Sequence, residues 1–367
     1  MKSDEKNGFK NKLKKRLPGL YLILRTVYCV IRRDKTYIQK SLMLFDDPKS
    51  DYLDIRHNGY KDYGKIIYVI KENSDREGFC ATMRFILGYL LYAQNYGFEP
   101  VIRLSKEFIY YDEGMNEKIP NPWEYYFLSH GDDYDENLAS NVCYCKYYHM
   151  MSLPEYEKLN AYSIENYYDE GLFKVCSPLI NKYMEIKPEI ISEASELICK
   201  TYAGGKKILG VHYRGTDYKR AYSGHPVCIE KEQVLCEIKK VLSGEKFGSV
   251  FLATDVASFY DNVKESFPEV TIMQFQNVYR SDGDISVAFT HDDRKYHHYL
   301  LGYEIARDMY ALSLCDGLIA GKSSVSFMSN LYKHSRNECY EYMSIIDNGN
   351  NLNEHTHISD RENTRNG

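Results

Sequence analysis

The chain has 367 residues, of which 44% are hydrophobic and 27% charged, and its formal net charge is −5. This length is sufficient for two domains with buried cores, and the composition excludes a disordered or fibrous protein. The chain beyond residue 40 is acidic, which argues against a broad nucleic-acid-binding face.

The first 40 residues carry twelve Lys or Arg against three Asp or Glu. Their apolar stretch, Gly19 to Ile31, is interrupted by Arg25 and is shorter than the roughly 20 residues that cross a bilayer. No small-residue cleavage site of a signal peptide follows. Residues 10–35 therefore suit a helix that lies on an anionic membrane surface. A basic helix packed on the acidic body of the same protein fits the pattern equally well.

The ten cysteines are scattered, and most lie inside apolar periodic segments, where cysteine behaves as a small hydrophobic residue. This distribution indicates a reducing compartment. We therefore expect a cytoplasmic protein. Whether residues 10–35 also bind the inner face of the cell membrane is left open by the sequence.

The first half of the chain predicts one β-α-β unit. An apolar strand at 65–71 is followed by a helix over 79–96, which ends at Gly97, and by a strand at 98–104. Residues 104–175 are less regular and rich in Tyr, Asp and Asn, and long segments of this kind are more often functional than idle. A single helix over 178–202 is expected to connect the two halves.

The second half alternates strands and helices, the pattern of a parallel sheet. Strands are expected at 207–213, 249–253, 269–275 and 317–321, and helices at 229–242, after Asp255, at 302–316 and at 322–335. From Asn348 the composition predicts a disordered tail. The predicted organisation is a basic N-terminal segment and connection (1–63), a first domain (64–203), a second domain (204–347) and a polar tail (348–367). The fold class is α/β, with two doubly wound domains.

Three polar clusters follow predicted strands of the second half: His212, Arg214, Thr216 and Asp217; Thr254 and Asp255; and Lys322, Ser323 and Ser324. Because ligands bind beyond the carboxyl ends of parallel strands, we expect these clusters to face one crevice. The Ser323/Ser324 turn opens a helix, whose first amide groups can hold a phosphate, although a serine there also serves as a simple cap.

Arg214 strengthens the interpretation as an anion site, because a guanidinium can offer forked donors to a phosphate. The alternative is a structural ion pair with Asp217 or Asp255. Asp308, on the helix before the last predicted strand, can reach the same crevice, where a carboxylate is the natural partner for the N1 and N2 donors of guanine; most aspartates on helices are merely solvated.

No metal site is expected. Cys143 and Cys145 lack a second ligand pair at zinc spacing. Two Asp-x-Asp pairs, Asp133 with Asp135 and Asp282 with Asp284, do not follow apolar strands, so neither is presented rigidly to a metal ion, and both are interpreted as loop polarity.

The motifs "HYRGTD", "FLATD" and "DMYALSLCDGLIAGKSSVS", in this order, resemble the donor-domain motifs of the GDP-fucose-dependent fucosyltransferase superfamily. The segment "EGFCATMRFILGYLLYAQNYGFEPVI" is similar to the turn and helix that open the catalytic region of that family. The resemblance covers about residues 65–335. It implies a GT-B type fold, in which two Rossmann-like domains face a central cleft, and an inverting enzyme without a metal or other cofactor.

Carried over residue by residue, the resemblance implies the following donor-binding set: His212, Arg214, Asp255, Arg280, Asp308, Ser323, Ser324, Gly78, Phe79 and Cys80. Arg214 and Ser324 would hold the β-phosphate, His212 and Asp308 the guanine, and Asp255 would lie by the ribose. Residues 78–80 would line the cleft between the domains.

This sequence departs from the family at two points. Gly215 stands where the animal enzymes have a second arginine, and residues 218–225 contain no glutamate to match their general base. Asp217 is the candidate base, besides Arg214 as a catalytic residue, with Glu124 in reserve.

The expected function is transfer of fucose from GDP-fucose to a glycan acceptor, in surface polysaccharide or glycoconjugate synthesis. The alternatives are a transferase for another GDP-sugar, such as GDP-mannose, and a non-catalytic module that binds a nucleotide or glycan. The loops of residues 104–175 are expected to choose the acceptor.

Overall fold

A computed structural model describes residues 55–71, 77–131, 133–201 and 205–353, together with five residues near the N-terminus. These five, Ile23, Leu24, Val27, Tyr28 and Ile31, are helical and exposed. The remainder of the segment 10–35 lies outside the described residues, so its contact with a membrane stays a prediction. Within the described part of the chain, no helix is both long and apolar enough to cross a membrane.

The first sheet has four strands in the order β1-β4-β2-β3. They are β1 (Ile55–Arg56), β2 (Ile67–Ile70), β3 (Glu99–Ile102) and β4 (Val142–Tyr144). Strand β2 runs parallel to β3 and β4, whereas β1 is antiparallel to β4. Helix α4 (Phe79–Tyr96) connects β2 to β3 and ends at Gly97, whose φ of 67° is left-handed. The predicted β-α-β unit is therefore confirmed, while β1 and β4 are too short to show a pattern in the sequence.

The second sheet has five strands in the order β7-β6-β5-β8-β9, and every neighbouring pair is parallel. They are β5 (Lys207–Tyr213), β6 (Phe247–Thr254), β7 (Thr271–Met273), β8 (Gly317–Gly321) and β9 (Tyr342–Ile346). The helices that alternate with them are α9 (Lys231–Leu242), α10 (Phe259–Ser266), α11 (His297–Leu314) and α12 (Ser324–Ser335). The predicted mixed α/β fold with parallel sheets is confirmed.

Short helices complete the fold. They are α5 (Glu113–Asn116), α6 (Tyr147–Met151) and four 3-10 turns: η1 (Pro122–Tyr125), η2 (Ile164–Tyr168), η3 (Asp217–Arg220) and η4 (Val287–Phe289).

The predicted connecting helix over 178–202 is wrong in its limits. The structure has two helices, α7 (Glu170–Tyr183) and α8 (Pro188–Thr201), because the chain between them leaves the helix to pair with residues 126–128. The amide of Leu128 donates to the carbonyl of Glu185, and the amide of Lys187 to that of Tyr126. Proline suits the first turn of α8, where its missing N–H costs no hydrogen bond.

Two further predictions differ from the structure. Helix α10 is capped at Ser258, not opened by Asp255, since Asp255 bonds to the loop after β5 instead. Residues 348–353, predicted as part of a disordered tail, pair with residues 221–227: Asn350 bridges Pro226, and the side-chain amide of Asn351 donates to two carbonyls there. Residues 354–367 lie outside the described residues.

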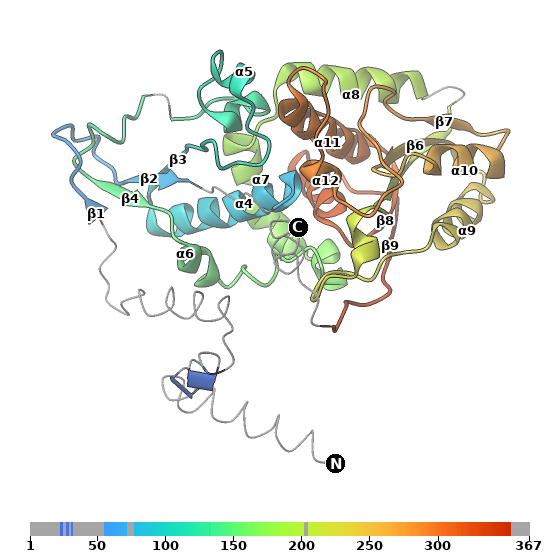
Figure 1. Ribbon diagram of the computed structural model, residues 1–367, viewed down its shortest axis with the longest axis horizontal. Helices are drawn as coiled ribbons and strands as arrows, with labels where there is room; N and C mark the ends of the chain where they lie inside the picture. Colours follow the sequence, from blue (N-terminus) through green and yellow to red (C-terminus); the bar gives the residue numbers. More distant parts are fainter. Residues whose placement is uncertain are drawn as a thin grey trace.

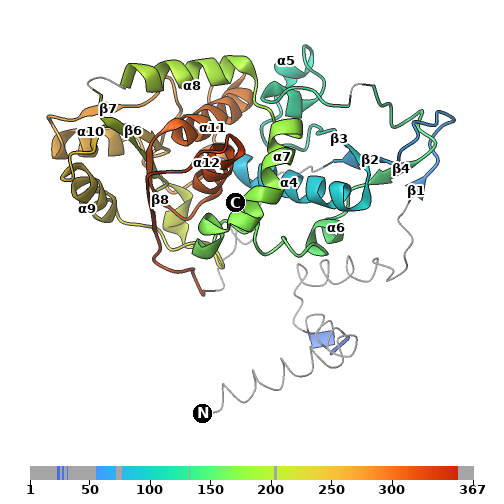
Figure 2. The same ribbon diagram turned by 180° about the vertical axis from the view of Figure 1, so that it is seen from behind.

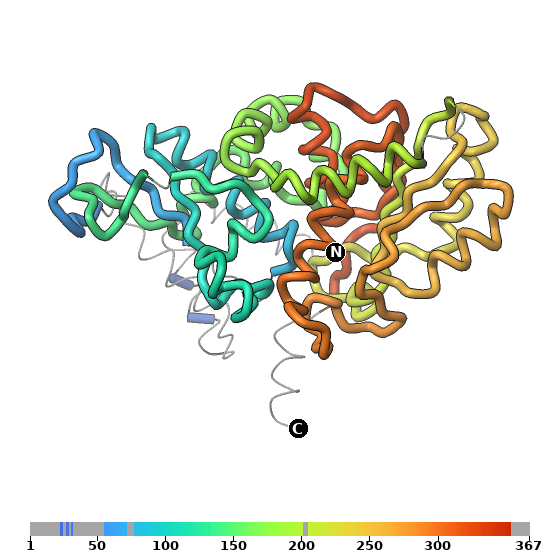
Figure 3. Tube along the Cα trace, turned by 90° about the horizontal axis from the view of Figure 1, so that it is seen from above, coloured from blue at the N-terminus to red at the C-terminus, as the bar shows by residue number. Residues whose placement is uncertain are grey.

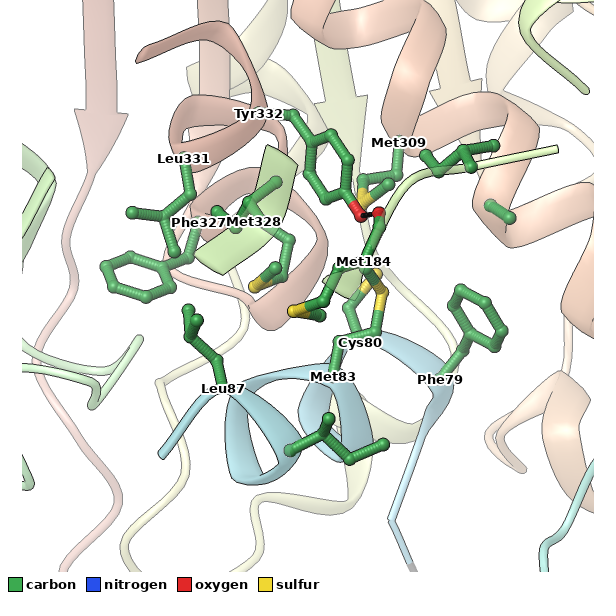
Figure 4. Close-up of a cluster of buried hydrophobic side chains, with 14 of the residues drawn as sticks. Phe79, Cys80, Met83, Leu87, Met184, Met309, Phe327, Met328, Leu331 and Tyr332 are labelled. Carbon is green, nitrogen blue, oxygen red and sulfur yellow. Dashed lines mark hydrogen bonds between the residues drawn. The ribbon is translucent and has the colours of Figure 1, made fainter. Parts of the chain in front are cut away.

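The two sheets lie at opposite ends of the molecule, with helices α4, α7, α11 and α12 between them (Figures 1 and 2). Helix α8 runs along α11 above this layer, as the view from above also shows (Figure 3). Apolar side chains of α4 face those of α12, with Met184 between them, and the hydroxyl of Tyr332 donates to the carbonyl of Met184 at 2.6 Å (Figure 4). One hydrophobic cluster therefore joins both halves and fixes the opening between them.

Candidate functional site

A cleft of about 1090 Å³, part of it open to solvent, lies between the two halves. The strand order of the second sheet reverses between β5 and β8, and a crevice at the carboxyl ends of the strands is the usual ligand site in such sheets. Nine of the eleven predicted site residues line this cleft: Gly78, Phe79, Cys80, His212, Arg214, Asp217, Asp255, Asp308 and Ser324. Residues far apart in the sequence are thus brought to one site.

Arg214 lies just beyond β5 and forms a two-pronged ion pair with Asp217. Its Nε donates to Oδ1 at 3.0 Å and its Nη2 to Oδ2 at 2.7 Å. The guanidinium carbon also lies 4.7 Å from the centre of the Tyr218 ring, a cation–π distance. Nη1 has no hydrogen-bond partner among the described residues and the side chain lines the cleft, so Arg214 can act both as an ion-pair partner and as a donor to a ligand.

At the N-terminus of α12, some polar groups form hydrogen bonds within the protein and others have no partner there. The hydroxyl of Ser323 caps the helix by accepting from the amide of Ser326, and the amide of Ser323 donates to the hydroxyl of Tyr167. Ser323 is thus used internally and lines a small neighbouring pocket, not the cleft. The amides of Ser324 and Val325 have no partner within the described part of the chain. These two N–H groups, at the positive end of the helix dipole, are therefore available to an anion.

His212 is buried at the end of β5, next to the same turn. Its Nδ1 lies 3.3 Å from the hydroxyl oxygen of Ser323. Burial, with a smaller contribution from Arg214, lowers the pKa of His212 to about 3. The imidazole is therefore neutral at physiological pH, so it offers a hydrogen bond and carries no charge to the cleft.

Asp255 holds the loop after β5 in place. Its Oδ1 accepts from the amide of Gly215 at 2.9 Å, and its Oδ2 accepts from the hydroxyl of Thr216 at 2.6 Å. A Cβ atom at residue 215 would lie 2.8 Å from Val256 and 3.0 Å from the ring of Tyr213. This crowding favours glycine at position 215.

Asp308 brings a carboxylate from α11 to the cleft, and it is 8% exposed. Burial raises its pKa to about 7, although Arg280 and Arg307 act in the opposite direction. Its Oδ1 is buried without a hydrogen-bond partner in the described structure. An unsatisfied buried carboxylate oxygen is costly in the free protein and is a strong acceptor for a ligand with N–H donors.

Arg280 does not line the cleft. Its Nε donates to the carbonyl of Thr254 and its Nη2 to that of Phe275, so the side chain spans the ends of β6 and β7. Its positive charge interacts with the carboxylate of Asp308, which lines the cleft, and acts to lower the pKa of that carboxyl.

The first half contributes one wall of the cleft, from Glu77 to Ala81 at the start of α4. Burial raises the pKa of the Cys80 thiol, which stays protonated and is no nucleophile. Tyr110 and Tyr162 also line the cleft, and the hydroxyl of Tyr110 accepts from the amide of Phe79. Glu77, Tyr110 and Tyr162 were not among the residues predicted from the sequence. The two tyrosines belong to the irregular segment 104–175, which was expected as a whole to be functional.

The two candidate bases are placed differently. Asp217 lines the cleft, but both of its oxygens are bound by Arg214, so it orients that guanidinium in the free protein. Glu124 does not line the cleft, and its Oε1 accepts from Asn121 and Ser129, so it supports a loop. Asp217 as the base stays a prediction.

The two carboxylates of the Asp-x-Asp pair in the second half, Asp282 and Asp284, form contacts within the protein. Asp282 accepts from the amide and the hydroxyl of Ser258 at the start of α10, and Asp284 forms an ion pair with Arg220. Among the described residues, no three His, Cys, Asp or Glu side chains are grouped as metal ligands.

The fold and cleft define a class: an α/β protein with parallel strands and a cleft between its two halves. No protein-family model and no curated protein matches the sequence. Solved fucosyltransferases are similar in structure. NodZ α-1,6-fucosyltransferase soaked with GDP-fucose has a TM-score of 0.41 at 18% identity, over 73% of this chain and 92% of the other.

Two more solved structures give similar values. Fucosyltransferase NodZ from Bradyrhizobium has a TM-score of 0.43 at 19% identity, covering 72% of this chain and 92% of that chain. POFUT1 in complex with GDP-fucose has a TM-score of 0.45 at 12% identity, covering 78% and 98%.

Proposed function

We propose that the protein is an inverting, metal-independent glycosyltransferase of the GT-B type, with two Rossmann-like domains, that moves fucose from GDP-fucose to a glycan acceptor. One observation carries the proposal: Arg214, the free amides that open α12 and the unsatisfied carboxylate of Asp308 line a single cleft. The choice of fucose rests on the motif "HYRGTD" and those that follow it.

The phosphate end of the donor would lie between Arg214 and the amides of Ser324 and Val325. As the bond from the sugar to the phosphate breaks, negative charge grows on the departing GDP. A guanidinium held in advance by Asp217, together with the N-terminus of α12, would stabilise this charge without reorganising. Charge-assisted hydrogen bonds of this kind each contribute about 1.5–3 kcal/mol.

The guanine would lie toward Asp308. The ionised carboxylate can accept from N1–H and from the N2 amino group, a pair of donors that adenine lacks. Neutral His212 adds a hydrogen-bonding group nearby, and Asp255 shapes the loop beside the ribose.

Glu77 would be the general base, in place of Asp217. It lines the same cleft as the residues proposed to hold the donor, and it comes from the first half of the chain. It would take the proton of the acceptor hydroxyl as that oxygen bonds to the anomeric carbon and the bond from this carbon to the phosphate breaks. Attack from the face opposite the leaving group inverts the anomeric centre.

The test begins with thermal unfolding of the full chain in the presence of GDP, ADP, UDP, GDP-fucose and GDP-mannose. A ligand at 100 times its dissociation constant adds about 2.7 kcal/mol to stability. We expect protection by GDP and GDP-fucose and none by ADP or UDP. A transfer and hydrolysis assay with GDP-fucose in excess chelator then tests catalysis and metal independence.

Each alternative gives a different result in these assays. No protection by any guanine nucleotide contradicts the proposal. Protection by GDP without transfer or hydrolysis of any GDP-sugar indicates a non-catalytic module, and turnover of GDP-mannose alone assigns a different sugar. Loss of activity in chelator contradicts metal independence.

The proposed setting is the cytoplasm, with residues 10–35 on the inner face of the membrane during surface polysaccharide synthesis. Removing residues 1–40 is expected to release the protein from membrane fractions. An unchanged membrane fraction would contradict this part of the proposal.

A further inference from the structure

A second cavity lies beside α4, further from the start of the helix than the cleft. It contains about 660 Å³ of free space, part of it open to solvent, within the usual range for small-molecule sites. Its lining comes from α4, from α6 and from the loop that follows α6. All of these except α4 belong to the irregular segment 104–175.

Helix α4 connects this cavity to the cleft. Cys80 and Ala81 line the cleft, and Arg84 and Phe85, four residues further on, line the cavity. Residues four apart lie on the same face of a helix, about 6 Å apart along its axis. The two spaces are therefore consecutive positions along one helix face.

Arg84 lies at the junction and is incompletely satisfied. Its side chain is 9% exposed, and Nη1 donates to the carbonyl of Leu159 at 2.7 Å. Its Nε is buried without a partner, and no carboxylate of the described residues forms an ion pair with it. The guanidinium carbon lies 5.7 Å from the centre of the Tyr162 ring, which lines the cleft. Arg84 thus places a guanidinium in the lining of the second cavity, next to a ring that lines the cleft.

Aromatic rings form a second part of the lining. The ring of Tyr147 meets those of Phe85 and Tyr156 edge to face, with centroids 6.4 Å apart in each case. The hydroxyl oxygens of Tyr147 and Tyr156 are 2.8 Å apart. Below them, α4 approaches Met150 so closely that a Cβ atom at residue 88 would lie 2.6 Å from it, which requires glycine.

Polar groups alternate with these rings. Tyrosine hydroxyls, the Arg84 guanidinium and the exposed side chains of Glu157 and Asn160 supply both donors and acceptors around the cavity. A sugar ring has an apolar C–H face and a rim of hydroxyls, so it suits aromatic faces combined with mixed donors and acceptors.

We propose that this second cavity is an acceptor subsite, which binds a pyranose ring of an oligosaccharide next to the ring that receives the transferred sugar. The assignment rests on the proposed function, because it makes the cleft the place of transfer. It predicts that the acceptor is an oligosaccharide of at least two rings and that the cavity contributes to its affinity.

The experiment measures binding of the full chain to an array of defined oligosaccharides of one to six rings, with GDP present. Tyr156→Ala removes a ring of the lining, and Arg84→Met removes the charge while keeping an unbranched side chain. Tyr60→Ala, at a tyrosine that is 87% exposed and outside both spaces, is the matched control. Thermal unfolding confirms that each variant is folded. If Arg84→Met does not fold, partly exposed Tyr156 decides the test.

We expect wild-type protein and Tyr60→Ala to bind oligosaccharides and not their single-ring units, with affinity at least fivefold weaker in Tyr156→Ala and Arg84→Met. Binding of no oligosaccharide by the wild type, or equal affinity in the cavity variants, overturns the inference. GDP binding measured in parallel by calorimetry tests the proposed function separately, since glycan binding that depends on Tyr156 without GDP binding contradicts the proposed function alone.

Discussion

The guanidinium of Arg214 is held by both carboxylate oxygens of Asp217, at 3.0 and 2.7 Å, three residues further along the chain. Asp217 is buried, with 3% of its surface exposed, and it lies in the 3-10 turn η3 that follows β5. This pair fixes the direction of Arg214 before any ligand arrives and leaves Nη1 without a hydrogen-bond partner among the described residues. The two interpretations of Arg214 from the sequence, ion-pair partner and phosphate donor, are therefore compatible.

Replacing Arg214 with alanine is expected to lower turnover by about 10²–10³-fold, the usual cost of a lost donor to developing charge. It should also lower the melting temperature, because the buried carboxylate of Asp217 loses its partner. Transfer assays with GDP-fucose and the melting temperature measure the two effects. Arg56→Ala, at an exposed arginine of β1, is the control and should retain full turnover. A variant of Arg214 with more than half of wild-type turnover would remove this residue from the mechanism.

Replacing Asp217 with asparagine separates orientation from proton transfer. If Asp217 orients Arg214, GDP affinity and turnover should fall together, each by about tenfold, because the guanidinium loses a charge-assisted pair. Breaking a buried ion pair should also destabilise the protein by about 3–5 kcal/mol. Calorimetry with GDP measures the affinity. Unchanged GDP affinity with turnover lost would show instead that Asp217 is the base.

Asp308 predicts a pH dependence of GDP binding. Its pKa of about 7 is raised by burial, and guanine donors would favour the ionised form. GDP affinity should therefore rise about tenfold per pH unit below pH 7 and level off above it. Titration of the diphosphate itself is controlled by measuring the same GDP profile with Asp308→Asn, which should lose the part that depends on the carboxylate. Identical pH profiles for the wild type and Asp308→Asn would contradict the contact.

The same carboxyl predicts how the stability of the free protein changes with pH. A raised pKa means that the folded state favours the protonated form, so stability is highest near pH 4 and is lost as the pH rises through about 7. Asp308→Asn should therefore raise the melting temperature more at pH 8 than at pH 5. An equal change at both pH values would mean that the carboxyl titrates near its ordinary value.

Replacing Ser324 with aspartate should change stability and binding in opposite directions. An acidic residue in the first turn of α12 interacts favourably with the helix dipole, by about 0.3–1 kcal/mol. The same charge would repel a diphosphate at the free amides, and GDP affinity should fall at least tenfold. Asn262→Asp adds the same charge to the first turn of α10, outside the cleft, and should leave GDP affinity unchanged. Equal GDP affinity in both variants would exclude this end of α12 from phosphate binding.

The regular elements of the second half could be predicted from the sequence because each is long enough to show its own period. Strands β5 and β8 have the predicted limits, 207–213 and 317–321. Parallel strands also present their carboxyl ends at one edge, so the convergence of His212, Arg214 and Ser324 followed from their places after strands. In contrast, β1 and β4 have two and three residues, and their existence depends on pairing with each other and with β2.

By itself, the sequence determined the alternation of strands and helices and the types of side chain at the strand ends, since both are local properties of the chain. Only the tertiary structure decided how those side chains are used. Asp217 pairs with Arg214, Ser323 caps α12, and Arg280 donates to the carbonyl of Thr254. These roles depend on distances between residues from different elements, and such distances are set by packing, not by sequence spacing.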